Sequence, residues 1–316
     1  MTEPTLDVFS AVEQLSTIRD FLRWSISQFN AFGVYFGHGT DNPWDEALAL
    51  IAHVTALPQD MDPRLLDARL TLAEREKIVS LVQRRVQDRV PLPYLTRVAW
   101  FGGFPFSVNP HVLIPRSPIA ELIDRRFEPW LAEEPKRVLD LCTGSGCIGI
   151  ATALVFPDAE VDLTDISEEA LSVALENCER HGVEDRVIPL LSDLFSSLEH
   201  ARYDLIVTNP PYVDAFDMSD LPPEYHHEPR LGLEAGNDGL DLVLVILAQA
   251  AEHLNEHGVL VCEVGNSMQA LQNLFPNVAF AWPEFSRGGH GVFVMTRAQI
   301  VQHQAEFEAA VAARQV

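Results

Sequence analysis

The architecture of this chain can be inferred from one segment, Val138-Leu-Asp140-Leu-Cys-Thr143-Gly144-Ser145-Gly146-Cys-Ile-Gly149. The apolar run at 138–141 predicts a buried strand, and the residues after the glycines predict a helix. Glycines let the backbone turn tightly, so that a ligand can approach the carboxyl end of the strand and the amino end of the helix. The spacing G-x-G-x-x-G is typical of a nucleotide-binding α/β unit.

Strands and helices alternate on both sides of that segment. The predicted strands are 138–141, 160–164, 187–191, 203–208 and 258–264, and the predicted helices between them are 147–156, 167–181 and 238–256. Such alternation predicts a parallel sheet covered on both faces. The chain ends differently: 278–284 and 291–295, joined by a glycine-rich turn, predict an antiparallel closing hairpin. The predicted class is therefore α/β, a Rossmann-like sheet with a C-terminal antiparallel hairpin.

A small helical domain is predicted before this sheet. The cap Asn42 before Pro43 begins one helix, and Thr71 with Glu74 forms a capping box that begins another. Two aromatic runs around Gly102-Gly103 predict a β-hairpin. We therefore divide the chain into a helical domain at 1–96, a hairpin linker at 97–116 and an α/β domain at 117–316.

Composition limits the classes of partner. The chain holds 22 Lys and Arg against 46 Asp and Glu, a formal net charge of −24. Direct binding to nucleic acid is not expected, because phosphate neutralisation requires a basic surface. The charge either keeps the protein soluble or attracts a basic partner.

Other classes are disfavoured by what the sequence contains. No run of eighteen apolar residues predicts a membrane span, and the N-terminus carries an acid where a signal peptide carries positive charge. The four cysteines are too scattered for a disulfide framework or a zinc site, so we expect no metal and a cytoplasmic protein.

Two cofactors compete for the glycine loop. Asp140 lies close to the helix N-terminus, where a carboxylate repels a pyrophosphate but suits a cation such as the sulfonium and ammonium of S-adenosyl-L-methionine. Asp165 ends the next strand and can bind ribose hydroxyls of that cofactor or of a nicotinamide dinucleotide. Asp193, after the third strand, either bonds adenine or is an ordinary turn residue. The candidate cofactor-binding residues are Asp140, Thr143, Gly144, Ser145, Gly146, Asp165, Asp193 and Asn209.

An acceptor site is predicted at Asn209-Pro210-Pro211-Tyr212, directly after the strand 203–208. The Asn209 side-chain oxygen and the Pro210 carbonyl can accept both N–H groups of a planar amide or aromatic amine. Tyr212 can stack on that plane. Asn209, Pro210 and Tyr212 are the candidate catalytic residues. Pro211 and Phe106 join them as candidate substrate-binding residues, with hairpin packing the alternative for Phe106.

Taken together, these motifs resemble those of the class I methyltransferases with a (D/N)-P-P-(Y/F) tetrapeptide, and more narrowly the protein glutamine 5-N-methyltransferases of the HemK/Prm family. The similar features are the loop 140–146, the tetrapeptide 209–212, Val112-Leu-Ile-Pro-Arg116 and Glu228-Pro-Arg-Leu-Gly-Leu233. The resemblance covers nearly the whole chain. It implies methyl transfer from S-adenosyl-L-methionine to a glutamine side chain.

Two branches of that family differ after Ile-Pro-Arg. The release-factor branch continues with Pro-(Glu/Asp)-Thr-Glu, whereas this chain reads Ser117-Pro-Ile-Ala-Glu121. The stretch Tyr35-Phe-Gly-His-Gly-Thr-Asp-Asn-Pro-Trp-Asp-Glu46 resembles the ribosomal-protein branch. The resemblance implies a glutamine of the third large-subunit ribosomal protein as substrate, free or in an assembling subunit, with the helical domain reading its surface.

Three other functions remain. Methylation of peptide chain release factors would use the same site. Methylation of the 6-amino group of adenine would use the same tetrapeptide, but a chain of net charge −24 is repelled by phosphate. A cofactor-binding scaffold without catalysis would not need Asn209 and Tyr212. A basic ribosomal protein is the partner that fits the charge.

Overall fold

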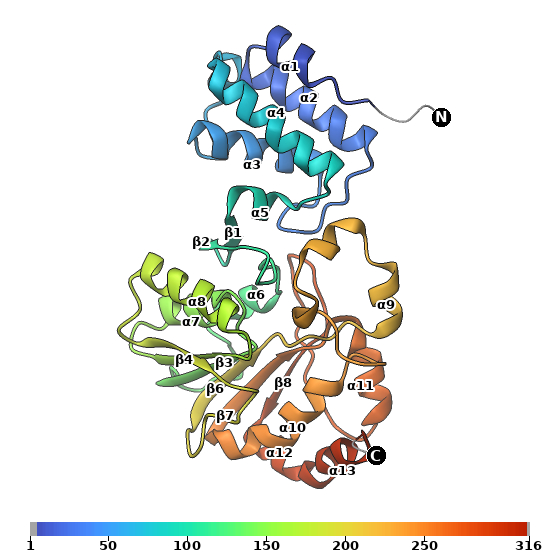
Figure 1. The fold of residues 1–316 in the computed structure, drawn as a ribbon. Helices are drawn as coiled ribbons and strands as arrows, with labels where there is room; N and C mark the ends of the chain where they lie inside the picture. The colour runs from blue at the N-terminus through green and yellow to red at the C-terminus, as the bar shows by residue number, and fades with distance from the viewer. Residues whose placement is uncertain (1–4, 315–316) are drawn as a thin grey trace. The chain divides into compact units, whose positions relative to one another are not determined.

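The computed structural model describes residues 5–314 of the 316-residue chain. The chain forms two compact units, Met1–Val98 with Pro222–His227 and Ala99–Leu221 with Glu228–Val316 (Figure 1). None of the helices within residues 5–314 is long and apolar enough to cross a membrane. We describe the two units separately.

The larger unit is built on a six-stranded sheet. Its strands are β3 (Arg137–Leu141), β4 (Glu160–Asp165), β5 (Val187–Leu191), β6 (Tyr203–Thr208), β7 (Leu254–Glu263) and β8 (Val292–Thr296). Their order is β5-β4-β3-β6-β7-β8, and all neighbours are parallel except β7 and β8. The first five follow the 3-2-1-4-5 order of a doubly wound fold, which confirms the predicted class.

Helices cover both faces of this sheet. They are α6 (Ile119–Asp124), α7 (Cys147–Val155), α8 (Glu168–His181), α10 (Asp241–His253), α11 (Met268–Leu274), α12 (Arg297–Gln302) and α13 (Gln304–Arg314), whereas the short helix α9 (Ala215–Asp220) has no buried residue and lies outside this packing. Side chains alternate along β3, so that Val138 packs with α6, α7 and α8 while Leu139 packs with α10 to α13 (Figure 1). The strands are therefore apolar on both faces.

The closing hairpin is only partly as predicted. β8 forms, but its full partner is β7, and the segment 278–284 is not a regular strand. It makes one antiparallel bridge, between Ala281 and Val294. Pro283 cannot donate a ladder hydrogen bond. Phe280 and Trp282 attach the segment instead by ring contacts with Phe293, at centroid distances of 5.0 and 5.8 Å.

The aromatic hairpin is present as predicted. β1 (Val98–Phe101) and β2 (Phe104–Ser107) form a two-stranded sheet. Gly102 and Gly103 join them with φ values of 55° and 81°. Two successive positive φ values are those of a tight hairpin turn, which a side chain would disfavour.

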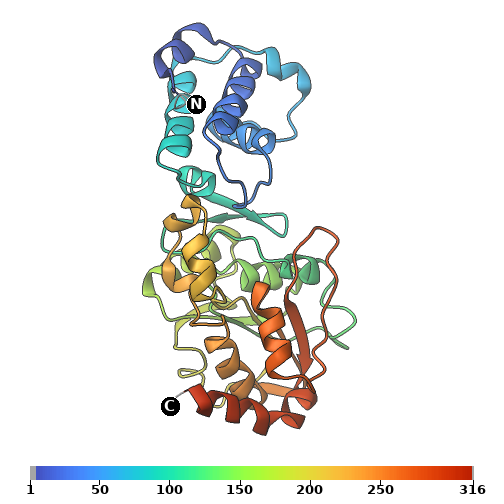
Figure 2. The ribbon, with the colours of Figure 1, turned by 90° about the vertical axis from the view of Figure 1, so that its right-hand side faces the viewer.

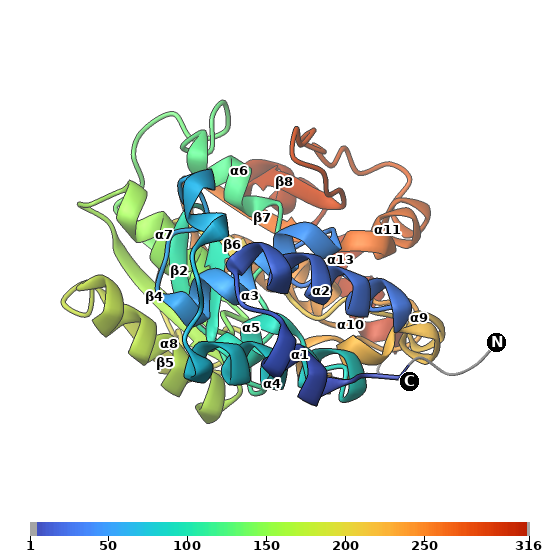
Figure 3. The same cartoon turned by 90° about the horizontal axis from the view of Figure 1, so that it is seen from above.

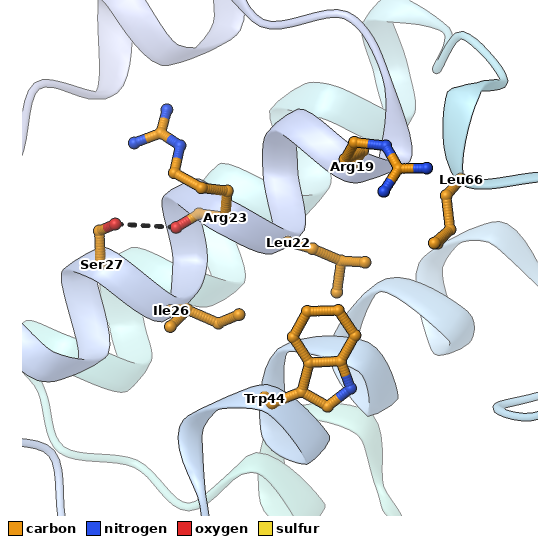
Figure 4. Close-up of a pocket in the computed structure, with 7 residues that line it drawn as sticks. All are labelled: Arg19, Leu22, Arg23, Ile26, Ser27, Trp44 and Leu66. Carbon is orange, nitrogen blue, oxygen red and sulfur yellow. Dashed lines mark hydrogen bonds between the residues drawn. The ribbon is translucent and has the colours of Figure 1, made fainter. Parts of the chain in front are cut away.

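The helical unit contains α1 (Val8–Gln14), α2 (Ile18–Ala31), α3 (Pro43–Thr55), η1 (Pro63–Asp67), α4 (Leu72–Gln87) and α5 (Leu92–Thr96). Both predicted caps form: Asn42 accepts from the Asp45 amide, and Thr71 and Glu74 complete a capping box. The helices α2, α3 and α4 pack around one apolar core (Figures 2 and 3).

A distant segment completes the helical unit. The short helix η2 (Pro223–His227) belongs to it, although this segment follows the acceptor tetrapeptide in the chain. Glu224 is buried there and accepts from the Tyr35 amide at 3.0 Å and from Arg85 Nη1 at 3.1 Å. Arg85 also pairs with the buried Glu46. The stretch 35–46, which resembles the ribosomal-protein branch, thus holds the segment 222–227.

Candidate active site

Asp140 lies at the end of β3 and is 1% exposed. Its Oδ2 accepts from Thr143 Oγ1 at 2.6 Å and from the Gly149 amide at 2.8 Å. Its Oδ1 is buried with no hydrogen-bond partner. Burial raises the pKa of Asp140 to about 7. Buried polar atoms in native proteins are normally paired, so this oxygen can accept from a ligand that carries a hydrogen-bond donor.

The loop after Asp140 is bent by three positive φ values. They belong to Cys142 (56°), Gly144 (55°) and Gly146 (78°). Such a φ is unfavourable for a cysteine, and residues of this kind concentrate at ligand sites. A Cβ at Gly144 would meet no atom within 4 Å, whereas one at Gly149 would lie 2.2 Å from Leu163 Cδ2. The first glycine therefore faces open space, and the last allows α7 to pack on β4.

Asp165 adjoins the same loop from the end of β4. Its Oδ2 accepts from the Gly144 amide at 2.9 Å and its Oδ1 from the Ser167 amide at 3.0 Å. Burial raises the pKa of Asp165. Asp193 follows β5, and its side chain is exposed. The three predicted acids thus lie at or just after the carboxyl ends of three adjacent parallel strands, where ligands bind in folds of this type.

The tetrapeptide reaches the same edge from β6. Leu141 pairs with Thr208, so Cys142 and Asn209 leave neighbouring strands at the same level. Asn209 Oδ1 is buried with no hydrogen-bond partner. Pro210 and Pro211 are buried, and Tyr212 is partly exposed. The structure therefore brings the amide of Asn209 and the glycine loop together at one edge of the sheet.

Phe106 does not join this group. Its side chain is 0% exposed and packs in the apolar core of the larger unit, with its ring 6.4 Å from Phe101 and 4.9 Å from the His181 imidazole. It has no free surface for an acceptor, so the packing alternative describes its position. The aromatic pattern of the hairpin did not distinguish a pocket wall from a core residue.

Arg116 and Glu121, at the two ends of the stretch where the two branches differ, hold loops in place by hydrogen bonds. Arg116 forms a bidentate pair with the buried Glu228, at 2.6 and 2.8 Å. Glu121 accepts from the Ser286 and Arg287 amides at 3.0 and 2.7 Å. These bonds, first among them that of Arg287, lower the pKa of Glu121 to about 2.

Sequence reasoning missed the support of Tyr212. The Tyr212 hydroxyl donates to Oε1 of the buried Glu263 at 2.8 Å, and Ser117 Oγ donates to Oε2 at 2.5 Å. Burial raises the pKa of Glu263. A signal was available, because Glu263 is the one charged residue in the apolar run 259–264 of a predicted buried strand.

Relatives of known function match nearly the whole chain. A protein of Francisella tularensis named ribosomal protein uL3 glutamine methyltransferase is 47% identical over 94% of this chain and 95% of its own length. A protein of Xanthomonas campestris with the same name is 50% identical over 96% of this chain and 99% of its own length. The chain belongs to this methyltransferase family.

A family model and solved structures also match parts of the chain. The family model described as the methyltransferase small domain matches residues 126–221, a range that contains the glycine loop and the tetrapeptide. Solved structures are more distant: a ribosomal protein L11 methylase from Lactobacillus delbrueckii is 22% identical over 56% of this chain and 76% of that chain, with a TM-score of 0.38. Family membership therefore follows from the two sequence relatives.

The part of the chain that the structure describes contains no group of three His, Cys, Asp or Glu side chains that could hold a metal ion. The candidate site presents amide, carboxylate, carbonyl and aromatic groups. Its arrangement suits a cationic ligand at Asp140 and a planar acceptor at Asn209.

Proposed function

We propose that this chain transfers a methyl group from S-adenosyl-L-methionine to the side-chain amide nitrogen of a glutamine in the large-subunit ribosomal protein uL3. One observation carries the proposal. Asp140 Oδ1 and Asn209 Oδ1 are buried acceptors without partners, and they follow or end neighbouring strands at one edge of the sheet. Two unsatisfied acceptors suit two donors, a cationic cofactor and an amide.

The residues of the loop fit the proposed cofactor. S-adenosyl-L-methionine supplies an electrophilic methyl group on a cationic sulfur. The carboxylate of Asp140 would face its ammonium and sulfonium end, and Thr143, Gly144, Ser145 and Gly146 would line its approach. Asp165 would bind ribose hydroxyls with the lone pairs that its two amide bonds leave free. Asp193 would bond adenine from its exposed position.

The tetrapeptide would orient the acceptor. Asn209 Oδ1 and the Pro210 carbonyl would accept the two N–H groups of the glutamine amide, and Tyr212 would stack on the amide plane. These bonds fix the nitrogen and direct its lone pair at the methyl group. The methylated nitrogen is strongly acidic and gives its extra proton to water or to these oxygens. Orientation of this kind lowers barriers by up to about 7–11 kcal/mol in model reactions.

Charge supports a basic protein as the substrate. The larger unit, residues 99–221 and 228–316, holds 32 of the 46 acidic side chains but only 12 of the 22 basic ones, so most of the net charge of −24 belongs to the unit with the candidate site. Such a unit attracts a basic ribosomal protein and repels nucleic-acid phosphate. Methylation of adenine is therefore disfavoured. We place the enzyme in the cytoplasm, where ribosomal proteins are made.

The helical domain is proposed to recognise the substrate. It has a core of its own and carries the stretch 35–46 that resembles the ribosomal-protein branch. In this proposal residues 1–96 read the surface of uL3, while the residues at the sheet edge perform the transfer. Release factors remain the alternative substrate class.

Mass spectrometry of modified ribosomal components tests the proposal. Unmethylated ribosomes, free uL3, release factors and ribosomal RNA are incubated with the enzyme and S-adenosyl-L-methionine. One added methyl group on a glutamine of uL3 is the expected result. Methyl on a release factor would assign the chain to the other branch, and methyl on adenine alone would refute glutamine methylation. Comparing ribosomes with free uL3 shows which form is the substrate.

A further inference from the structure

Glu263 is a buried carboxylate that the mechanism above does not use. It ends β7, is 4% exposed, and has a hydrogen bond at each oxygen. Tyr212 donates to Oε1 at 2.8 Å and Ser117 donates to Oε2 at 2.5 Å. The ring that is proposed to stack on the acceptor is therefore tied through its hydroxyl to the interior of the sheet.

Tyr212 is also held at its backbone and along its ring. Ser267 Oγ donates to the Tyr212 carbonyl at 3.0 Å. A Cβ at Gly265 would lie 2.4 Å from Tyr212 Cε2, and a Cβ at Gly239 would lie 2.1 Å from the Tyr212 carbonyl oxygen. The edge of the ring thus rests on bare backbone, where no side chain would fit. The bond to Glu263 fixes the hydroxyl end of the ring as well, so that Tyr212 is held at both ends.

We infer that Glu263 is a positioning residue for methyl transfer, which through the Tyr212 hydroxyl fixes the plane of the ring against which the acceptor amide stacks. This inference rests on the proposed function, because it assigns Tyr212 to the acceptor. The angle between the amide plane and the incoming methyl group depends on that ring. Small errors in such an angle are costly for a displacement reaction.

The energetic cost of burying Glu263 indicates that this residue serves to position Tyr212 rather than to stabilise the fold. Burial raises the pKa of Glu263, which records that placing a carboxylate there is unfavourable. Arg116 offsets part of this cost, although its guanidinium is committed to Glu228. Replacing buried ionic groups with apolar ones is often neutral or stabilising. What the carboxylate of Glu263 provides is two hydrogen-bond acceptors at fixed positions, and one of them accepts from the partly exposed Tyr212.

A double-mutant cycle measures the connection between the two residues. Tyr212→Phe, Glu263→Gln and the double variant are compared for kcat, for KM with unmethylated uL3, and for the Kd of S-adenosyl-L-methionine. We expect Tyr212→Phe to lower kcat about tenfold, the effect of losing one charge-assisted hydrogen bond, and Glu263→Gln to lower kcat by less, because an amide oxygen accepts more weakly from Tyr212 than a carboxylate does. The double variant should be as slow as Tyr212→Phe alone, because both changes act on the same bond. Cofactor Kd should stay unchanged.

Glu121→Gln is the matched control. Glu121 is a buried carboxylate of the same unit that holds Ser286 and Arg287 and does not contact the tetrapeptide residues. We expect this change to lower the melting temperature and to leave kcat unchanged. Losses that multiply in the double variant, or a kcat for Glu263→Gln equal to that of the wild type, would overturn the inference.

A second measurement separates this inference from the proposed function. The chain has five tyrosines, so the Cζ signal of Tyr212, which responds to hydrogen bonding at its hydroxyl, can be followed by NMR after ¹³C-tyrosine labelling, with Tyr212→Phe to assign the signal. We expect this signal to move in Glu263→Gln while the signals of the other four tyrosines stay in place. A wild-type enzyme that leaves uL3 unmethylated refutes the proposed function. An unmoved Tyr212 signal refutes the role of Glu263 independently of any substrate.

Discussion

Asp140→Asn gives a sharp test of the cofactor site, because it changes charge and leaves shape almost intact. The side-chain oxygen of an asparagine can still accept from Thr143 and Gly149, as Asp140 Oδ2 does. What disappears is the cost of holding a carboxylate in the interior. The variant is therefore expected to be more stable than the wild type without ligand, and to bind the cofactor less well.

The size and sign of the effect follow from the pKa. Asp140 has a pKa of about 7 in the folded chain against 3.8 for the unperturbed group. Each pKa unit is worth about 1.4 kcal/mol, so ionising Asp140 costs the free enzyme on the order of 4 kcal/mol at high pH. The folded state holds the proton more tightly, so this stability is present below pH 4 and is lost as pH rises through 7. The advantage of Asp140→Asn should grow over that window.

Thermal unfolding at several pH values without ligand measures this advantage. At pH 5 the two proteins should melt within a few degrees of each other, and at pH 8.5 the variant should melt roughly 10 °C higher. Glu160→Gln, an exposed change on the neighbouring strand β4, serves as the control with no trend. Parallel melting curves from pH 5 to 8.5 would refute the reasoning. Calorimetry should show S-adenosyl-L-methionine binding weakened about 10- to 100-fold.

Three further changes test other parts of the structure. Asn209→Ala should lower turnover on uL3 at least about 100-fold, by loss of orientation, and leave the calorimetric cofactor Kd nearly unchanged; equal turnover would refute the acceptor role. Gly149→Ala should destabilise the larger unit by about 1–3 kcal/mol in thermal melts, since the methyl group of the alanine would overlap the side chain of Leu163. Arg85→Ala removes the guanidinium that pairs with the buried Glu46 and leaves Glu224 with the longer pair to Arg89, at 3.4 Å, so urea unfolding should show a loss of about 3–5 kcal/mol; a loss below 1 kcal/mol would mean that the network does not hold the unit together.

Local patterns predicted much of the fold and of the candidate site. The glycine loop, the capped helices and the hairpin turn depend on residues that are close in sequence, so spacing was enough to place them. The predicted acids and the tetrapeptide meet at one edge because parallel strands end there. That edge follows from the alternation of strands and helices alone.

Features that depend on distant partners could not be predicted in this way. Phe106 has the composition of a pocket wall, but its burial beside His181 is decided by tertiary packing. The apolar run 278–284 has the pattern of a strand but forms a single β-bridge. Pro283 cannot donate a ladder hydrogen bond, and the neighbouring aromatic rings pack on Phe293 instead. The bond between Glu263 and Tyr212 joins residues 51 positions apart. Sequence patterns that span a few residues cannot predict a contact between residues so far apart in the chain.

The return of Pro222–His227 to the helical unit means that the boundary between the units is crossed more than once by the chain. A fragment that ends near residue 98 would keep Arg85 and Glu46 and lack Glu224, so it would contain an incomplete buried network. Isolation of a folded helical unit would require a fused or added peptide spanning 222–227. A chimaera that takes this unit from a relative would likewise need both of its segments, residues 1–98 and 222–227, from that relative, because Arg85 of the first segment pairs with Glu224 of the second.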